Sequence, residues 1–235
     1  MKNIFLISLL VTIYINAPAQ PLKTDEVFIN KNGIEKLIVE HIPAAITGEN
    51  MVTYRLFIDM DNYTAYQLLL GTEETGELFI KTSGTWYNTS DVGKTLGHDI
   101  LYVLISENHF PALKHDSYFS SGGCADNLIA VPYSENDKGF IHEKPAQTIV
   151  FPSALNLDMF KNKNSSDPFL TNDGCISYNP SEKRGVKGPS SSNIVFIGQF
   201  TTDGNLMLKL NIQTFDFKTN KAKVTSGILY SSNTN

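Results

Sequence analysis

The chain has 235 residues, of which 41% are hydrophobic and 18% charged, and its formal net charge at pH 7 is −5. This composition is typical of a globular protein with ample material for a core. Charged residues are scattered along the chain rather than grouped. Their distribution argues against a nucleic-acid partner, because a basic stripe would be needed to meet the phosphates.

Residues 1–19 predict a secretory signal peptide. Lys2 supplies an early positive charge, an apolar run extends from Ile4 to Ile15, and Ala17-Pro18-Ala19 precedes Gln20. This run is shorter than the roughly 20 residues of a membrane-spanning helix, and no later segment approaches that length. We expect a protein without a membrane span that is secreted, periplasmic or located at the cell surface.

The first half of the mature chain predicts a series of strands. Residues 20–33 are polar and turn-rich and are expected to form an irregular lead-in segment. Residues 34–42 predict a strand ended by Pro43, which cannot donate to a ladder. Residues 52–83 predict three further strands, and the turn after the first is Asp61-Asn62. The first of these alternates, with one apolar face made by Val52, Tyr54, Leu56, Ile58 and Met60.

The middle of the chain is less regular. Residues 98–110 predict a buried strand or a short helix, and residues 113–122 and 127–134 each predict a strand. A loop-rich insertion at about 135–192 contains one convincing strand, at residues 147–152. Such a long irregular connection is unusual inside a compact domain unless it is functional or poorly ordered.

The last part of the chain has the clearest local pattern. Residues 194–201 and 206–214 predict a β-hairpin, because Asp203-Gly204 between them suits a tight turn. A final strand is expected at 223–230. Roughly nine to ten strands without a convincing amphipathic helix predict an all-β fold, an antiparallel β-sandwich or jelly roll, as a single domain over 34–230.

Several of these segments resemble a recurring domain in exported proteins of Bacteroidetes-type bacteria. The family is associated with large surface proteins that carry a C-terminal secretion-sorting module. The resemblance implies export and a β-rich fold, and it implies no catalytic residues. Because the chain ends soon after its last predicted strand, secretion through a sorting module is not expected. The matching segments are VTYRLFIDM with the Leu-rich strand after it, FIKTSGTWYN, FPALKHDSYFSSGG and NIVFIGQFTTDGNLMLKLNIQ.

Both cysteines, Cys124 and Cys175, lie in glycine-containing loops of the mature chain. In an oxidising compartment such a pair predicts a disulfide bond. Closing a loop of about 50 residues would stabilise the fold by about 4 kcal/mol in the chain-entropy model. Two separate buried thiols, or a reactive Cys124, are the alternatives. A nucleophile would need a histidine partner, and no motif points to one.

An aromatic group is the main candidate for ligand binding. An exposed platform could bind a sugar ring or a partner protein, since aromatic faces pack on apolar, CH-rich surfaces. Packing in the core is the default explanation for most of the same side chains. The residues concerned are Trp86, Tyr87, Tyr118, Phe119 and Tyr133.

Cofactor and catalytic motifs are weak in this chain. The oxygen-rich segments 59–62 and 167–173 make calcium a candidate, although turn chemistry explains both. No nucleophile elbow or phosphate-binding glycine loop is present. Scattered histidines (His98, His109 and His115) predict no metal site, and the acids that a glycosidase would need (Glu73, Glu74 and Glu77) fall in a predicted solvated loop.

These patterns favour a non-enzymatic surface or interaction module, with a glycan or a surface protein as partner. The main alternative is a carbohydrate-binding or carbohydrate-active protein built on the same sandwich. A third hypothesis is an enzyme that uses Cys124 or a histidine site.

Overall fold

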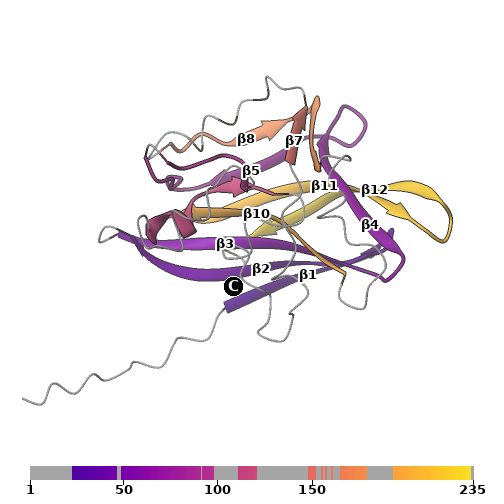
Figure 1. Cartoon of the computed structure of the whole chain (residues 1–235), viewed down its shortest axis with the longest axis horizontal. Helices are drawn as coiled ribbons and strands as arrows, with labels where there is room; N and C mark the ends of the chain where they lie inside the picture. The colour runs from indigo at the N-terminus through magenta and orange to yellow at the C-terminus, as the bar shows by residue number, and fades with distance from the viewer. Residues whose placement is uncertain are drawn as a thin grey trace, which may run out of the picture.

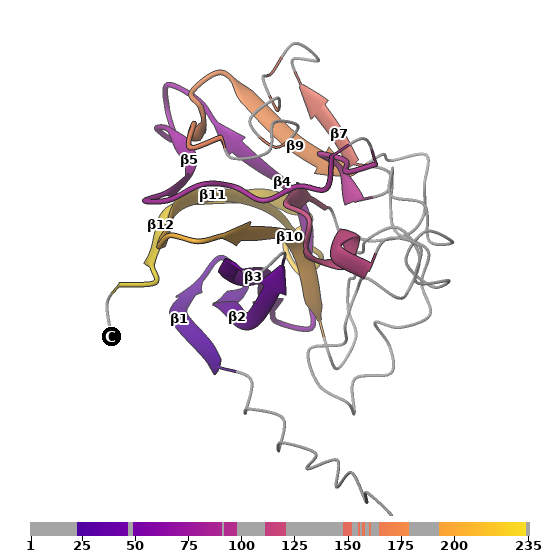
Figure 2. The same ribbon diagram turned by 90° about the vertical axis from the view of Figure 1, so that its left-hand side faces the viewer.

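The computed structural model describes residues 23–46, 49–90, 92–97, 111–120, 148–151, 155, 157, 160, 165–178 and 193–233. They form two antiparallel sheets, one of five strands and one of seven, which pack on each other. Figures 1 and 2 show β1, β2 and β3 on one side of the molecule and β5 and β7 on the other. The predicted all-β antiparallel sandwich is confirmed, with twelve strands in the described part instead of nine or ten.

The five-stranded sheet has the order β1-β2-β3-β10-β6. Its strands are β1 (Lys23–Lys31), β2 (Ile34–Ile46), β3 (Glu49–Met60), β10 (Ile194–Thr202) and β6 (Tyr118–Phe119), and the short 3-10 helix η2 (Pro111–His115) precedes β6. The seven-stranded sheet has the order β7-β9-β4-β11-β5-β8, and β12 pairs with β11. Its strands are β4 (Thr64–Gly71), β5 (Leu78–Thr82), β7 (Thr148–Phe151), β8 (Phe169–Thr171), β9 (Gly174–Tyr178), β11 (Leu206–Asp216) and β12 (Lys221–Ser231).

The core lies between the two sheets. The alternating pattern of β3 directs every second side chain of this strand into the core. Tyr54, Leu56, Ile58 and Met60 are buried there, and Val52 packs against them, as the period of two predicts. The seven-stranded sheet contributes Leu69, Ile80, Ile176, Leu208, Leu210 and Ile212. The two apolar faces together exclude water from the space between the sheets.

Three features of the predicted strand pattern are wrong. The lead-in segment 20–33 contains β1, whose Val27 and Ile29 pack against the core while its alternate side chains face solvent. Pro43 does not end β2, which continues to Ile46. The loop-rich insertion contains β8 and β9 besides the predicted β7. β1 and β8 are edge strands, which bury only part of their surface, so neither has a long apolar run; β9 lies between β7 and β4 and has only 5 residues.

The predicted hairpin at Asp203-Gly204 is also wrong, because β10 and β11 belong to different sheets. β10 pairs with β3 and β6, whereas β11 pairs with β4, β5 and β12. The turn packs instead on residues 83–85: Asp203 Oδ1 accepts a hydrogen bond from the Thr85 backbone N–H at 2.6 Å. A Cβ atom at Gly204 would lie 2.1 Å from the Gly84 nitrogen, so glycine is required by this close approach.

Strand β11 is shared by three neighbours. β12 runs along one edge, while β4 pairs with residues 212–216 and β5 with residues 206–209 of the other edge. Asn211 occupies the branch point between β4 and β5 and is fully buried. On the β12 side the register shifts between Leu210 and Ile212, which marks a bulge there.

The Asn211 side chain completes the hydrogen bonding at this branch. Its Nδ2 donates to the carbonyl oxygens of Leu70 and Gly76, both at 3.0 Å. Its Oδ1 accepts from the Gly227 N–H at 2.9 Å, and Gly227 has the positive φ of 75° that the bulge needs. One side-chain amide therefore forms hydrogen bonds with backbone groups of β4, the β4–β5 loop and β12.

We expect Asn211→Leu to lower the free energy of unfolding by about 2–4 kcal/mol, because several buried backbone groups lose their partners. Chemical denaturation of the two proteins measures the difference. Gln213→Leu is the matched control, since Gln213 lies two residues away and its Nε2 donates only to Gln67 on the half-buried outer face. An equal loss in both variants would contradict the role of Asn211.

Candidate functional site

The predicted aromatic platform is not exposed. Trp86, Tyr118 and Phe119 are 0% exposed and Tyr87 is 5% exposed, while Tyr133 lies outside the described residues. Trp86 packs edge-on against two phenylalanine rings of the core, and its Nε1 donates to a backbone carbonyl at 2.8 Å. Trp86 and Phe119 therefore belong to the core, Tyr87 packs in a smaller apolar cluster with Ala44 and Met51, and Tyr118 is buried outside both clusters, so the four described residues form no exposed platform.

The two cysteines are not described equally. Cys175 lies on β9 as a free, half-buried thiol, and burial raises its pKa. A raised pKa disfavours the thiolate that a nucleophile needs. The structure shows no disulfide at Cys175, and Cys124, its predicted partner, lies outside the described residues.

Residues proposed as calcium ligands serve turns. Asp61 Oδ1 accepts from the Tyr63 N–H at 2.9 Å and from Thr64 Oγ1 at 2.7 Å, and Asp173 accepts from Thr171 Oγ1 at 3.1 Å. Within the described residues, no group of three or more His, Cys, Asp or Glu side chains could hold a metal ion. His98 and His109 lie outside them; the loop acids are exposed at Glu73 and Glu74 and half-buried at Glu77.

Four polar side chains form a row across the outer face of the five-stranded sheet, on the side opposite the core. Strand register places Glu40 beside Arg55, Arg55 beside Gln199, and Gln199 beside Tyr118. All four are buried, at 4% exposure or less. Sequence alternation identifies this face as polar, and a polar strand face ordinarily meets solvent. The structure instead buries it.

Two carboxyl groups with perturbed pKa values lie along this polar row: Glu40 is at one end of it, and Asp116 lies next to it. Neither carboxylate oxygen of Glu40 has a hydrogen-bond partner among the described residues. Burial raises the pKa of Glu40 to about 7, against the opposing effect of the Arg55 guanidinium. Arg55 Nε donates to Gln199 Oε1 at 2.9 Å, and Gln199 Nε2 donates to the Asp116 carbonyl oxygen at 2.8 Å. The row thus connects Glu40 to the segment that carries Asp116.

Asp116 is fully buried beside the end of η2. Its Oδ1 accepts from the N–H and the hydroxyl of Thr89, both at 2.7 Å, while burial raises the pKa of Asp116 to about 7. His115, the preceding residue, forms a hydrogen bond of 2.8 Å between its Nδ1 and Thr53 Oγ1. Buried acids that change charge near neutral pH are a frequent feature of functional sites.

A second candidate lies where the edge strands β1 and β12 of the two sheets approach each other. A pocket of about 380 Å³ opens there. Side chains from both sheets line it, and nearly all of them are apolar. The lining residues are Val27, Phe79, Met207, Leu208, Leu229, Tyr230 and Ser231.

Tyr230, at the wall of the pocket, belongs to a cluster of three titratable side chains from β1, β2 and β12. Its hydroxyl donates to Asp25 Oδ2 at 2.8 Å and lies 2.9 Å from His41 Nε2. His41 Nε2 is 2.8 Å from the same Asp25 oxygen. Burial lowers the pKa of His41, opposed by Asp25, and burial together with Asp25 raises the pKa of Tyr230. Both rings are therefore neutral near pH 7.

Sequence reasoning did not identify this cluster. Asp25 and His41 are 16 residues apart and Tyr230 lies 189 residues beyond His41, so no local motif joins them. Antiparallel pairing of β1 with β2 would have predicted that Asp25 and His41 lie close together. That prediction required β1 to be recognised as a strand.

No protein-family model matches the chain, and a search among curated proteins found no match. The resemblance to the Bacteroidetes domain stays a prediction. In the part of the chain that the structure describes, no helix is long and apolar enough to cross a membrane.

The raised pKa of Glu40 predicts a pH-dependent stability. Between the ordinary pKa of 4.5 and the folded value of about 7, the unfolded chain loses its proton first, so stability falls as pH rises. We expect Glu40→Gln to be more stable than the parent at about pH 8 by on the order of 2–3 kcal/mol, and nearly equal at about pH 4.5.

Denaturant titrations of both proteins across this pH range measure the effect. Glu73→Gln is the matched control, because Glu73 is exposed and its removal should leave the pH dependence unchanged. If the difference between Glu40→Gln and the parent stays constant over the pH range, the buried carboxyl does not titrate as described.

Proposed function

We propose that the protein is an exported, non-enzymatic binding module that holds an apolar ligand group in the pocket between β1 and β12. The pocket carries this proposal: its volume of about 380 Å³ lies within the range of small-molecule sites, and its lining is apolar with one fixed phenol. The predicted signal peptide supports export, with the periplasm, the cell surface or the medium as destination.

The exposed side chains of the pocket supply the driving force. Leu229 is 61% and Met207 37% exposed, and covering such apolar surface stabilises a complex by about 25 cal/mol per Å². Tyr230 is held in place by Asp25 and His41, so its hydroxyl orients the ligand at little entropic cost. The hydrogen bonds that Tyr230 makes with Asp25 and His41 support a positioning role for its phenol.

Burial of Trp86, Tyr87 and Tyr118 removes the feature that motivated a carbohydrate-binding or carbohydrate-active protein. These three positions therefore offer no exposed aromatic ring on which a sugar could pack. The interaction-module hypothesis does not depend on them, and the pocket gives it a defined location.

Binding of the fluorescent probe anilinonaphthalene sulfonate to the folded protein tests the pocket. Leu229→Lys and Met207→Lys should each weaken binding by about tenfold, because a charge replaces buried apolar contact. Phe28→Lys is the matched control: Phe28 is 69% exposed on β1, next in sequence to the pocket residue Val27, but does not line the pocket. Equal losses in all three variants, or no probe binding, would contradict the proposal.

Mass spectrometry of the exported protein tests the predicted processing. We expect Gln20 at the N-terminus and a bridge between Cys124 and Cys175, seen as a peptide pair that separates on reduction. A retained N-terminal segment would contradict export through a cleaved signal. Two readily alkylated thiols would contradict the bridge.

A further inference from the structure

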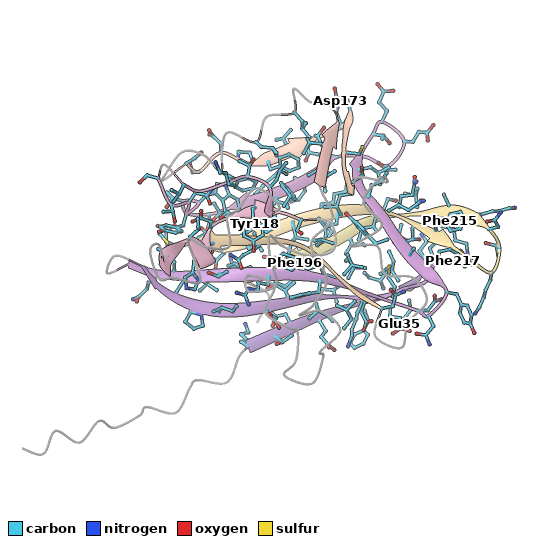
Figure 3. All side chains as sticks on the ribbon, in the orientation of Figure 1. Glu35, Tyr118, Asp173, Phe196, Phe215 and Phe217 are labelled. Atoms are coloured by element: carbon cyan, nitrogen blue, oxygen red, sulfur yellow. The ribbon has the colours of Figure 1, made fainter. Side chains whose placement is uncertain are left out.

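The turn between β11 and β12 lies at the right-hand end of the long axis in Figure 1. The turn between β3 and β4 packs beside it, since the Phe217 N–H donates to the Tyr63 carbonyl oxygen at 2.9 Å. Figure 3 shows Phe215 and Phe217 at this end. We call this surface the hairpin tip; it comprises Tyr63, Phe215, Phe217, Lys218, Lys221, Lys223 and Val224.

The hairpin tip exposes large apolar side chains. Phe217 is 51%, Tyr63 47% and Val224 39% exposed. The rings of Phe215 and Phe217 pack edge to face with centroids 5.2 Å apart. Aromatic side chains that gather on a surface, rather than scatter singly, mark an interaction site.

Hydrogen bonds around Asp216 hold the turn that displays these rings. Asp216 Oδ1 accepts from the Lys218 N–H at 2.7 Å and the Thr219 N–H at 3.2 Å, and Oδ2 accepts from Lys223 Nζ at 2.6 Å. Asn220 adopts the left-handed conformation with φ of 54°. The hydrogen bonds of Asp216 thus fix the turn in a conformation that leaves Phe217 at the surface.

The charge of the hairpin tip is opposite to that of the whole chain. Residues 216–223 contain three lysines and one carboxylate, Asp216, whereas the chain has a net charge of −5. Lys218 Nζ lies 3.6 Å from the centroid of the Tyr63 ring, so cation and aromatic side chains share one surface. Lysines beside exposed aromatics match an anionic lipid surface, where ammonium groups meet headgroups and rings enter the interface.

We propose that the hairpin tip docks onto anionic lipid headgroups and inserts Phe217 into the interfacial region. A lipid surface fits better than a protein partner, because three exposed apolar side chains at one end suffice for shallow insertion. A typical protein–protein interface needs about 20–30 residues on each side. This binding is separate from the pocket, which lies at the other end of β11, at Met207 and Leu208.

Co-sedimentation of the whole mature protein with vesicles tests the proposal. We expect binding to phosphatidylcholine vesicles that contain phosphatidylglycerol, little binding to phosphatidylcholine alone, and weaker binding at high salt. Phe217→Ser should weaken binding by about tenfold, because the inserted ring is lost. Lys218→Glu should also weaken vesicle binding, and the loss should be larger at low salt than at high salt.

Phe28→Ser is the matched control, because Phe28 is 69% exposed on β1 with Lys36 Nζ 5.8 Å from its ring and is not one of the residues of the hairpin tip. A Phe217→Trp variant reports insertion directly, since its emission should shift to shorter wavelength with vesicles while the buried Trp86 contributes no shift. Equal losses in Phe28→Ser and Phe217→Ser, or vesicle binding without an emission shift, would overturn insertion. Binding to soluble polyglutamate but not to vesicles would assign the tip to an acidic protein and overturn the lipid proposal.

Discussion

The hydrogen bonds of Asn211 allow one long strand to serve three neighbours. β11 has more residues than either β4 or β5, and the two short strands follow each other along one of its edges with a gap at residues 210–211. Asn211 supplies the side-chain donor in that gap to the buried Leu70 carbonyl group of β4 and to the part-buried Gly76 carbonyl group that precedes β5. A single buried polar residue thus forms hydrogen bonds with β4, the β4–β5 loop and β12 at the branch of the seven-stranded sheet.

Both proposed binding surfaces depend on this arrangement, because they lie on opposite halves of β11. The half paired with β5 contributes Met207 and Leu208 to the pocket. The half paired with β4 leads to Phe215 and the hairpin tip, and its pairing brings the β3–β4 turn beside that tip. The bulge at Gly227 keeps β12 in register with both halves, so the edge strand contributes Tyr230 at one end and Val224 at the other.

Burial of the polar row distinguishes the outer face of the five-stranded sheet from the apolar core. Glu40 and Asp116 each have buried oxygens without hydrogen bonds among the described residues, and Arg55 has such a nitrogen. Leaving such groups unpaired costs about 1–3 kcal/mol each, more where they are charged. The fold carries this cost on one face while the space between the sheets contains almost only apolar side chains.

Local patterns in the sequence determined the all-β class and the core-facing residues of β3, because a period of two depends only on neighbouring residues. The same local evidence left a platform open at Trp86, although core packing was the default. It failed at Asp203-Gly204, whose turn chemistry is the same within a hairpin and between sheets. Tertiary structure alone decided these points, together with the convergence of Asp25, His41 and Tyr230 and the burial of Glu40. Each depends on which strands become neighbours, and that is settled by contacts between residues far apart in the chain.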